Sequence, residues 1–262
     1  MIKKIASTLN VSVSTVRRAL GDFPDIGAET KERVKKTASD MGYRPDFLAR
    51  AMITKKTLLI GLIVPEFDST FFPRVISSVE GCAAKNGYRI LIAKHDYSQE
   101  KFHAAVQTFS QYRVDGLILS PPEKELAEST RKEIRELARP VVFFDDDCPG
   151  EGLAWVGTDD IRAGEMAASY VVDCGFRRPA FTGRNTRSTS AQDRLDGFEK
   201  KLGGENIFLN PTFIFSGDFS EKTGEASAET ILRSPGKPDV VFCANDQIAA
   251  GLMMKLREGG LR

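Results

Sequence analysis

The chain has 262 residues, of which 41% are hydrophobic and 28% are charged, a composition that excludes a largely disordered protein. Its longest apolar stretch, residues 58–65, is far too short to cross a bilayer, and the first residues lack the apolar core of a signal peptide. We therefore expect a cytoplasmic protein with no membrane partner. The four cysteines match neither a zinc spacing nor a dense disulfide framework, so we expect buried free thiols.

The net charge of +1 hides an uneven distribution of charge along the chain. Residues 1–57 carry 12 Lys/Arg against 6 Asp/Glu, whereas the rest of the chain carries 25 against 30. Lysines and arginines release condensed counterions when they neutralise phosphates, so a basic head on an acidic body suggests a nucleic-acid-binding module. A solvated helical surface is the alternative that charge alone leaves open.

Helical spacing of apolar residues predicts a three-helix module in residues 1–45. The first helix ends near Asn10, a residue that tolerates the left-handed conformation. The second is capped by Ser12 and ended by Gly21, and the third covers about residues 28–41. Two short helices joined by a tight turn form a helix-turn-helix, whose second helix is small enough to enter the DNA major groove.

The motifs VSVSTVRRAL and TKERVKKTASDMGYRPDFLARAM resemble the headpiece of the LacI/GalR family of bacterial repressors. That family's pattern, V-S-x-x-T-V-S-R-x-L-N followed by G-Y-x-P-N-x-x-A-x-x-L, is met by Val11, Ser12, Thr15, Val16, Arg18, Leu20, Gly42, Tyr43, Pro45 and Ala49. The chain departs from the pattern at Lys4, Arg17, Gly21, Asp46 and Met52. The resemblance implies a transcriptional regulator, by default a repressor, that binds double-stranded operator DNA.

The expected DNA contacts lie in the second helix and its cap. Base edges are expected to be read by Val13, Ser14 and Arg18. Phosphates are expected to be bound by Ser12, Thr15 and Arg17. Arg18 can donate a pair of hydrogen bonds to guanine, whereas phosphate contacts fix position without carrying sequence information. For each residue the alternative is a solvated helix surface, which the surrounding basic module makes the weaker interpretation.

Residues 46–57 are predicted as a hinge helix and linker. The segment is short enough that a helix there would be marginal by itself. The resemblance implies that it folds when two subunits of a homodimer place it side by side in the minor groove, each inserting an apolar side chain that kinks a base step. Met52 takes that position in this chain. A linker methionine without a role is the alternative, since Met is softer than the usual leucine.

From residue 58 onward, short apolar runs alternate with amphipathic stretches. The runs are LLIGLIV, YRILIA, DGLILS, PVVFF, LAWV, PAFT, TFIF and DVVFC. The stretches are residues 72–86, 100–112, 124–137, 160–174, 191–202, 220–233 and 246–258. Apolar runs without polar alternation predict parallel strands buried on both faces, and the amphipathic stretches predict crossover helices.

Eight such strands could form one sheet, but the resemblance implies two Rossmann-like lobes with an effector cleft between them. The lobes are expected at residues 58–157 and 158–262, in the manner of periplasmic sugar-binding proteins. The predicted fold class is therefore a small all-α helix-turn-helix headpiece joined to an α/β periplasmic-binding-protein-like domain.

Ligands of open parallel sheets bind beyond the carboxyl ends of the strands, so the loops there are the expected effector site. Aromatic rings together with carboxylate, amide and guanidinium groups suit a sugar or a derivative of one. The resemblance assigns pocket-lining roles to Phe71, Phe72, Asp145, Trp155, Arg194, Phe219 and Asn245. Asp246, in the loop after the last run, is a further candidate. Phe71 and Phe72 could equally be core residues, and Asp246 could equally cap a helix.

Catalytic signatures such as G-x-S-x-G, G-x-x-x-x-G-K and G-x-G-x-x-G are absent from the sequence, so we expect neither an enzyme nor a cofactor. We also expect no metal, because the successive residues Asp145, Asp146 and Asp147 cannot all point at one ion and are more simply solvated. His95 and His103 are expected to be surface residues. The rival classes are a periplasmic solute-binding protein, a sugar-processing α/β enzyme and a regulator that senses no ligand.

The resemblance also yields an expectation about the end of the chain. Family members continue for several strands and helices beyond the position of Arg262, so we expect an unfinished second lobe with weak effector binding and impaired dimerisation. Repression relieved by a sugar is the default mechanism, although some relatives bind DNA better with effector and nothing in the sequence fixes the sign.

Overall fold

A computed structural model describes residues 1–21, 23–43, 51, 54–148, 152–185 and 187–261. The chain divides into two compact units, Met1–Leu58 and Leu59–Arg262, and each unit is described by itself. Met52 and most of the predicted hinge lie outside the described residues, so the wedge role of Met52 stays a prediction. No helix among the residues described is long and apolar enough to cross a membrane.

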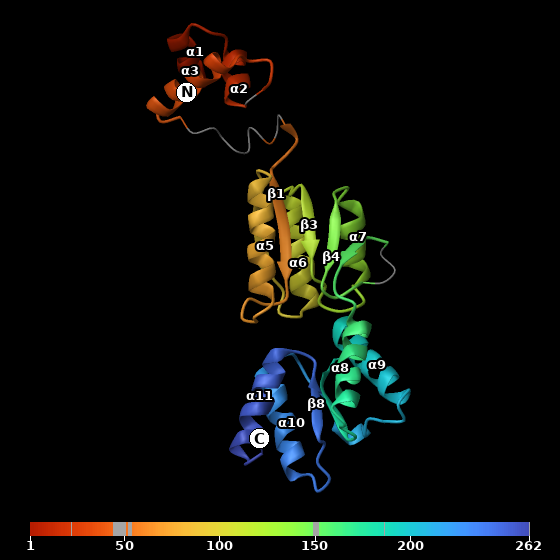
Figure 1. The fold of residues 1–262 in the computed structure, drawn as a ribbon. Coiled ribbons are helices and arrows are strands. Elements are labelled where there is room, and N and C mark those ends of the chain that lie inside the picture. The colour runs from red at the N-terminus through yellow and green to blue at the C-terminus, as the bar shows by residue number, and fades with distance from the viewer. Residues whose placement is uncertain (22, 44–50, 52–53, 149–151, 186, 262) are drawn as a thin grey trace. The chain divides into compact units, whose positions relative to one another are not determined.

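The first unit is a bundle of three helices (Figure 1): α1 (Ile2–Leu9), α2 (Val13–Leu20) and α3 (Ala28–Asp40). Its core is made of apolar side chains spaced one helical turn apart, and Ile5, Val16, Ala19 and Val34 have no exposed surface. Asn10 ends α1 in the left-handed conformation, with φ 53°, as its residue type predicts. The short α1–α2 connection therefore produces the helix-turn-helix that the apolar spacing indicates.

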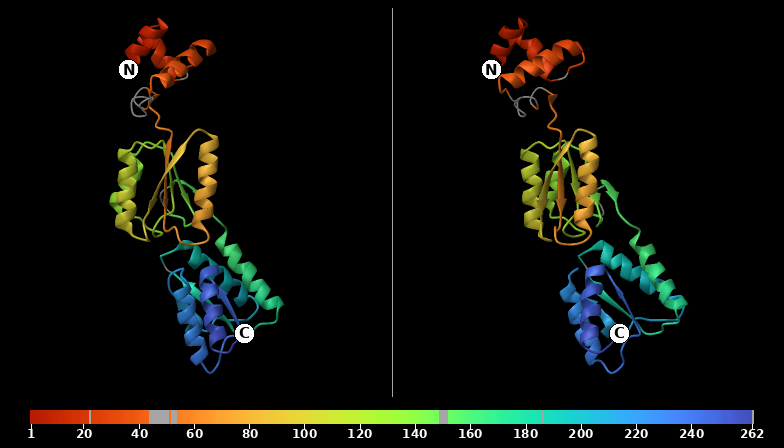
Figure 2. Two further views of the ribbon diagram at one scale, coloured as in Figure 1. Left: turned by 90° about the vertical axis from the view of Figure 1, so that its left-hand side faces the viewer. Right: turned by 60° about the vertical axis from the view of Figure 1, so that its left-hand side comes forward.

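The first lobe of the second unit contains a five-stranded parallel sheet with strand order β2-β1-β3-β4-β5. Its strands are β1 (Leu59–Val64), β2 (Arg89–Lys94), β3 (Gly116–Leu119), β4 (Val141–Phe144) and β5 (Ala154–Val156). Its helices are α5 (Phe72–Lys85), α6 (Gln99–Gln111) and α7 (Glu128–Glu136). Figure 2 shows α5 on one face of the sheet and α6 and α7 on the other, which gives three layers.

Close packing of a helix on this sheet depends on one glycine. The ring of Phe109 in α6 lies over β1, and a Cβ at Gly61 would come within 2.4 Å of it. The registers Ile60↔Ile90 and Ile60↔Gly116 pair β1 with β2 and β3 without a bulge. The carboxyl ends of these neighbouring parallel strands therefore meet at the same edge of the sheet.

The second lobe contains a three-stranded parallel sheet with order β7-β6-β8. Its strands are β6 (Pro179–Arg184), β7 (Ile214–Ser216) and β8 (Val240–Cys243). Its helices are α8 (Asp160–Asp173), α9 (Thr189–Gly203), α10 (Glu221–Arg233) and α11 (Asp246–Glu258), with a 3₁₀ turn η1 (Pro211–Phe213) before β7. One face of the sheet is covered by α8 and α9 and the other by α10 and α11 (Figure 1). The eight apolar runs thus form two sheets, and the alternative of a single sheet is wrong.

The expectation that all cysteines are buried is wrong for two of them. Cys148 is buried and Cys243 half-buried, but Cys82 and Cys174 are exposed. Cys82 lies on the outer face of α5, and Cys174 caps the carboxyl end of α8, where the side chain leaves the packed interface. Apolar character alone did not distinguish these helix positions from core positions.

Candidate DNA interface and effector cleft

Helix α2 begins at a side-chain cap. Ser12 Oγ accepts a hydrogen bond from the Thr15 backbone N–H at 2.9 Å and lies 2.8 Å from the Thr15 hydroxyl oxygen. This cap satisfies an amide that would otherwise lack a partner at the helix start. Ser14 and Arg17 are exposed, whereas Val13 is half-buried and packs against the headpiece core.

Arg18 is exposed on α2 and is held by two neighbours within the headpiece. Its guanidinium forms an ion pair with the carboxylate of Asp25 and lies 5.6 Å from the centre of the Phe23 ring. The two side chains of the ion pair are 48% and 45% exposed, so water screens the pair. Any further partner of the Arg18 guanidinium would compete with Asp25 for it.

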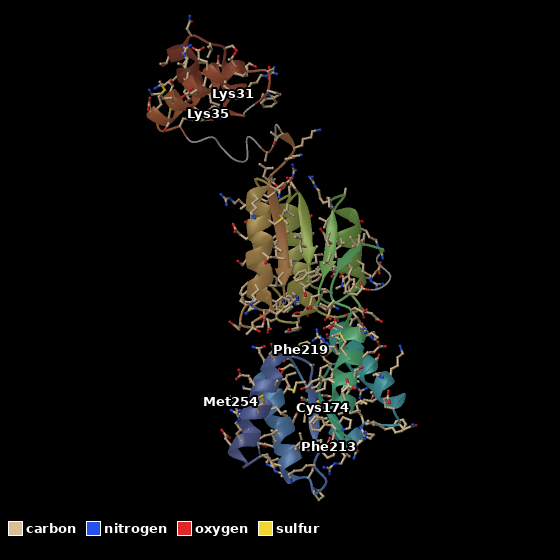
Figure 3. The ribbon with its side chains drawn as sticks, in the orientation of Figure 1. Lys31, Lys35, Cys174, Phe213, Phe219 and Met254 are labelled. Carbon is tan, nitrogen blue, oxygen red and sulfur yellow. The ribbon has the colours of Figure 1, made fainter. Side chains whose placement is uncertain are left out.

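A basic surface on α3 completes the headpiece. Lys31 and Lys35 on α3 (Figure 3) line a wide surface hollow together with Ala28, Glu32 and Lys36. Its walls are charged, and none of the described residues that line it is aromatic, which is unlike a small-molecule pocket. Its lysines add to the positive charge available to phosphates.

A cavity of about 270 Å³ lies in the second unit, where loops of both lobes meet. Its lining residues all follow strands: Tyr97, Pro122, Asp146, Asn185, Arg187, Ser188, Gly217, Asp218 and Phe219. Parallel sheets bind ligands beyond the carboxyl ends of their strands, and this cavity is in that position for both sheets. Phe219 lies at that edge of the second lobe (Figure 3).

Asp146 joins the two lobes through the start of α9. Its Oδ1 accepts hydrogen bonds from Ser188 Oγ at 3.0 Å, Thr189 Oγ1 at 3.1 Å and the Ser190 backbone N–H at 2.8 Å. A carboxylate at a helix N-terminus is favourable because unpaired amides and the helix dipole concentrate positive charge there. The expectation that this acidic run is solvated is wrong for Asp146, which is 8% exposed.

A second link between the lobes involves Arg187. Its guanidinium pairs with the carboxylate of Glu123, and it lies 3.5 Å from the backbone oxygen of Tyr97. The Lys124 backbone N–H donates to the Arg187 carbonyl at 3.1 Å. Three residues of the first lobe therefore fix the position of one arginine of the second.

Asp145 occupies a left-handed backbone position, with φ 67°, directly after β4. Burial raises the pKa of its carboxyl to about 7, and the neighbouring charge of Asp146 adds to the shift. Its carbonyl accepts a hydrogen bond from Trp155 Nε1 at 3.1 Å. Trp155, 40% exposed, therefore contacts the backbone beside the cavity.

Arg194 is fixed within the second lobe. Its Nε donates to Asp160 Oδ1 at 2.8 Å, and its Nη1 donates to the Ala244 carbonyl at 2.6 Å. Helices α8 and α9 approach closely because of Gly164 and Gly197, where a Cβ would lie 2.1 Å and 2.0 Å from backbone oxygens of the opposite helix. Arg194 thus ties α9 to α8 and to the end of β8.

Asn245 connects the start of α11 to Phe219. Its Oδ1 accepts from the Ile248 backbone N–H at 2.9 Å, and its Nδ2 donates to the Phe219 carbonyl at 2.9 Å. The cap predicted as an alternative for Asp246 therefore belongs to Asn245. Asp246 is the first residue of α11 and is exposed.

The predicted effector residues differ in how close they come to the cavity. Phe219 lines it, Asp145 directly precedes the lining residue Asp146, and Asn245 donates a hydrogen bond to the Phe219 carbonyl. Trp155, Arg194 and Asp246 are not among its lining residues. Phe72 is 6% exposed and packs in the core of the first lobe, which fits its alternative interpretation, whereas Phe71 is 49% exposed. The lining residues that sequence reasoning missed, such as Tyr97 and Arg187, carry one detectable signal, their position directly after a strand.

His95 is completely buried, so its prediction as a surface residue is wrong. It directly follows β2, and its backbone N–H donates to the Val64 carbonyl at 3.1 Å. Its Nδ1 accepts from the Tyr97 backbone N–H at 3.1 Å, and its Nε2 lies 3.1 Å from the Ser120 carbonyl, which requires the proton on Nε2. Burial lowers the pKa of the imidazole to about 4. His95 therefore holds the loop that carries Tyr97, whose φ is 56°.

His103 is half-buried and bonds at 3.1 Å to the hydroxyl of Thr130 in α7. The two histidines thus have separate structural partners. Among the residues that the structure describes, no group of three His, Cys, Asp or Glu side chains is arranged to hold a metal ion.

Comparisons with known proteins identify both units. Residues 60–262 match the periplasmic binding protein domain family, and residues 1–46 match the lacI family of bacterial regulatory proteins. The HTH-type transcriptional repressor PurR of Histophilus somni (strain 129Pt) is 28% identical, with 100% of this chain and 78% of that protein covered. The ribose operon repressor of Haemophilus influenzae shows the same identity and the same two coverages.

Solved structures agree with this result. A LacI-family transcriptional regulator from Silicibacter pomeroyi has a TM-score of 0.79 at 26% identity, over 100% of this chain and 78% of that one. The lac repressor dimer bound to operator and an anti-inducer has a TM-score of 0.87 at 23% identity, with the same coverage, and supports the fold. The predicted fold class is confirmed: the chain belongs to the periplasmic binding protein domain family and carries a headpiece of the lacI family of bacterial regulatory proteins, and it is a DNA-binding transcriptional regulator.

Proposed function

We propose that the chain is a cytoplasmic repressor that binds near-palindromic operator DNA as a homodimer and is controlled by a sugar-like effector. The observation that carries this proposal is the cavity at the strand ends of both lobes, in a chain whose other unit is a capped, basic helix-turn-helix. We divide the chain into the headpiece (1–45), the hinge (46–57), the first lobe (58–157) and the second lobe (158–262).

On the DNA side, the exposed face of α2 supports sequence recognition. We assign base contacts to Val13, Ser14 and Arg18. We assign phosphate contacts to Ser12, Thr15 and Arg17, and the minor-groove wedge to Met52. The exposure of Ser14, Arg17 and Arg18 leaves these side chains accessible to a groove, and the half-buried Val13 can still offer a methyl group to a thymine.

On the effector side, the chemistry of the cavity supports a compact polyhydroxylated ligand. The volume of about 270 Å³ lies just below the ~300–1,000 Å³ range typical of ligand sites, so a small ligand is expected. The ring of Phe219 offers a stacking face, and hydroxyls can bond to the carboxylates and the amide that surround it. The name of the ribose operon repressor, a relative, agrees with a sugar. We retain Phe71, Phe72, Asp145, Trp155, Arg194, Phe219, Asn245 and Asp246 as effector-site candidates and add Tyr97, Asn185, Arg187 and Asp218.

The mechanism that we propose has two states with different lobe arrangements. An effector that binds one arrangement better shifts the population toward it, and the hinge helices form or melt in response. The Asp146 link to α9 and the Arg187–Glu123 ion pair are the contacts that must rearrange, because they join the lobes at the cavity. Relief of repression is the default outcome of effector binding.

Selection of operator sequences from random DNA, with and without a panel of sugars, tests this function. We expect a near-palindrome to be enriched, because two recognition helices of a dimer enter successive major grooves. Arg18→Ala is expected to lose preference at one base pair of each half-site, and Arg17→Ala is its matched control. Arg17→Ala should weaken binding to all sequences alike, since phosphate contacts carry no sequence information. Failure to enrich any common sequence would contradict the proposal.

A further inference from the structure

We propose that the cleft admits only ligands without negative charge, namely uncharged or amine-bearing polyols, and that it excludes sugar phosphates and sugar acids. The inference rests on the proposed effector function and names the ligand class of that same site. It stands on the positions and partners of the charged side chains at the cavity.

Three cations at or near this site have carboxylate partners. Arg187, the cation among the described lining residues, pairs with Glu123. Arg194 pairs with the buried Asp160, and Lys94, at the end of β2, lies 2.8 Å from an oxygen of Asp96. An anionic ligand would have to displace one of these carboxylates before it gained a partner. Arg184 is exposed and does not line the cavity.

The carboxylates that line the cavity have acceptor capacity left over. Asp146 and Asp218 both line it, and in each the hydrogen bonds from described residues go to Oδ1. For Asp218 the donors are the Ser220 amide at 3.1 Å and the Thr223 hydroxyl at 2.9 Å, together with the Ser220 hydroxyl. Oδ2 of each remains for a ligand hydroxyl or ammonium group, and an ionised carboxylate accepts but does not donate.

The pKa of Tyr97 is raised by burial and by negatively charged side chains that surround its hydroxyl. After burial, the causes that raise the pKa of its phenol are the charges of Glu66, Asp145, Asp146 and Asp218. Four carboxylates from both lobes therefore lie near one hydroxyl that lines the cavity. Tyr97 stays protonated, so it can donate to a sugar oxygen, whereas a phosphate in the same place would face like charges.

Collisional quenching of tryptophan fluorescence tests, without a known ligand, the charge around Trp155, which lies beside Asp145 next to the cleft. Trp155 is the single tryptophan of the chain and bonds to the backbone of Asp145. At pH 8 and fixed ionic strength we expect caesium to quench it at least twofold better than iodide, each normalised to free N-acetyltryptophanamide. Asp145→Asn should lower this ratio, and Glu136→Gln, a remote carboxylate on α7, should leave it unchanged. Equal or stronger quenching by iodide would overturn the proposal.

Calorimetric titrations with matched ligands test the same exclusion directly. The probes are ribose with ribose 5-phosphate, and glucose with glucosamine and glucose 6-phosphate. We expect any member that binds to be uncharged or amine-bearing, and at least tenfold tighter than its phosphate. Tighter binding of a phosphate would overturn the proposal. If no sugar altered operator binding, the effector function would fail, while the quenching ratio would still decide the charge of the cleft.

Discussion

Two arginine–aspartate pairs, one in each unit, show how burial changes what an ion pair can do. Arg18 and Asp25 in the headpiece are 48% and 45% exposed, whereas Arg194 and Asp160 in the second lobe are 24% and 6% exposed. An exposed pair contributes little to stability and is easily exchanged for another partner. A buried pair is costly to break, because the remaining charge loses its partner away from water. The exposed Arg18–Asp25 pair can therefore exchange Asp25 for another partner, whereas the buried Arg194–Asp160 pair holds the second lobe together.

The largest effect is expected from Arg194→Ala. The substitution leaves Asp160 buried without its partner, so the free energy of unfolding should fall by about 3 kcal/mol. Urea unfolding followed by circular dichroism measures this change. Arg162→Ala, which removes an exposed partner of Glu165 on the same helix, should cost less than ~0.5 kcal/mol. Equal losses in the two variants would remove the contrast between the buried and the exposed pair.

A pH-dependent effect is expected from Asp145. Because its pKa is raised to about 7 in the folded state, the folded chain holds a proton that the unfolded chain releases above about pH 4. The stability that this group contributes is therefore fully present below about pH 4 and is lost as the pH rises from about 4 through about 7. Asp145→Asn should remove about 2 kcal/mol of the difference in unfolding free energy between pH 5 and pH 8. A variant with the same pH dependence as the wild type would count against a largely buried carboxyl.

Arg18→Ala should act on recognition and not on folding. We expect a loss of ~1–3 kcal/mol in preference at one base pair of each half-site, with an unfolding free energy within ~0.5 kcal/mol of the wild type. Binding of single-substitution operator variants, measured by fluorescence anisotropy, separates the positions. A uniform loss across all sequences would instead make Arg18 a phosphate contact.

The smallest effect is expected from Asp25→Asn. Removal of the carboxylate that competes for Arg18 should raise operator affinity by up to about fivefold, since an exposed pair is worth ~0.2–1 kcal/mol. Asp40→Asn, which removes an equal charge at the end of α3, is the matched control and should raise affinity less. Equal gains in both variants would point to a general effect of net charge.

Local patterns in the sequence predict the fold well because they follow local physics. The spacing of Ile5 and Val16 indicates core faces, Ser12 is a preferred cap residue, and uninterrupted apolar runs become buried parallel strands. Phe219 was assigned to the pocket by the family resemblance, and its position agrees with the rule that ligands bind beyond strand ends. These features need only neighbours along the chain or the order of its elements.

The features that sequence reasoning missed depend on contacts between distant segments. Asp146 binds an amide 44 residues away, and His95 meets a carbonyl 25 residues away. Nothing near these residues indicates burial, so a charge run and a lone histidine were assigned to the surface. Asn245 and Asp246 are adjacent residues of similar capping preference, and only the path of the chain decides between them.

The most direct test of the whole account is operator affinity with and without a ligand that binds the cleft. With the selected operator and a saturating uncharged or amine-bearing sugar that binds by calorimetry, we expect the dissociation constant to change at least about fivefold, because coupling between two sites typically amounts to 1–3 kcal/mol. Linkage requires the operator to change sugar affinity by the same factor. An operator affinity that stays the same while the sugar occupies the cleft would contradict the account.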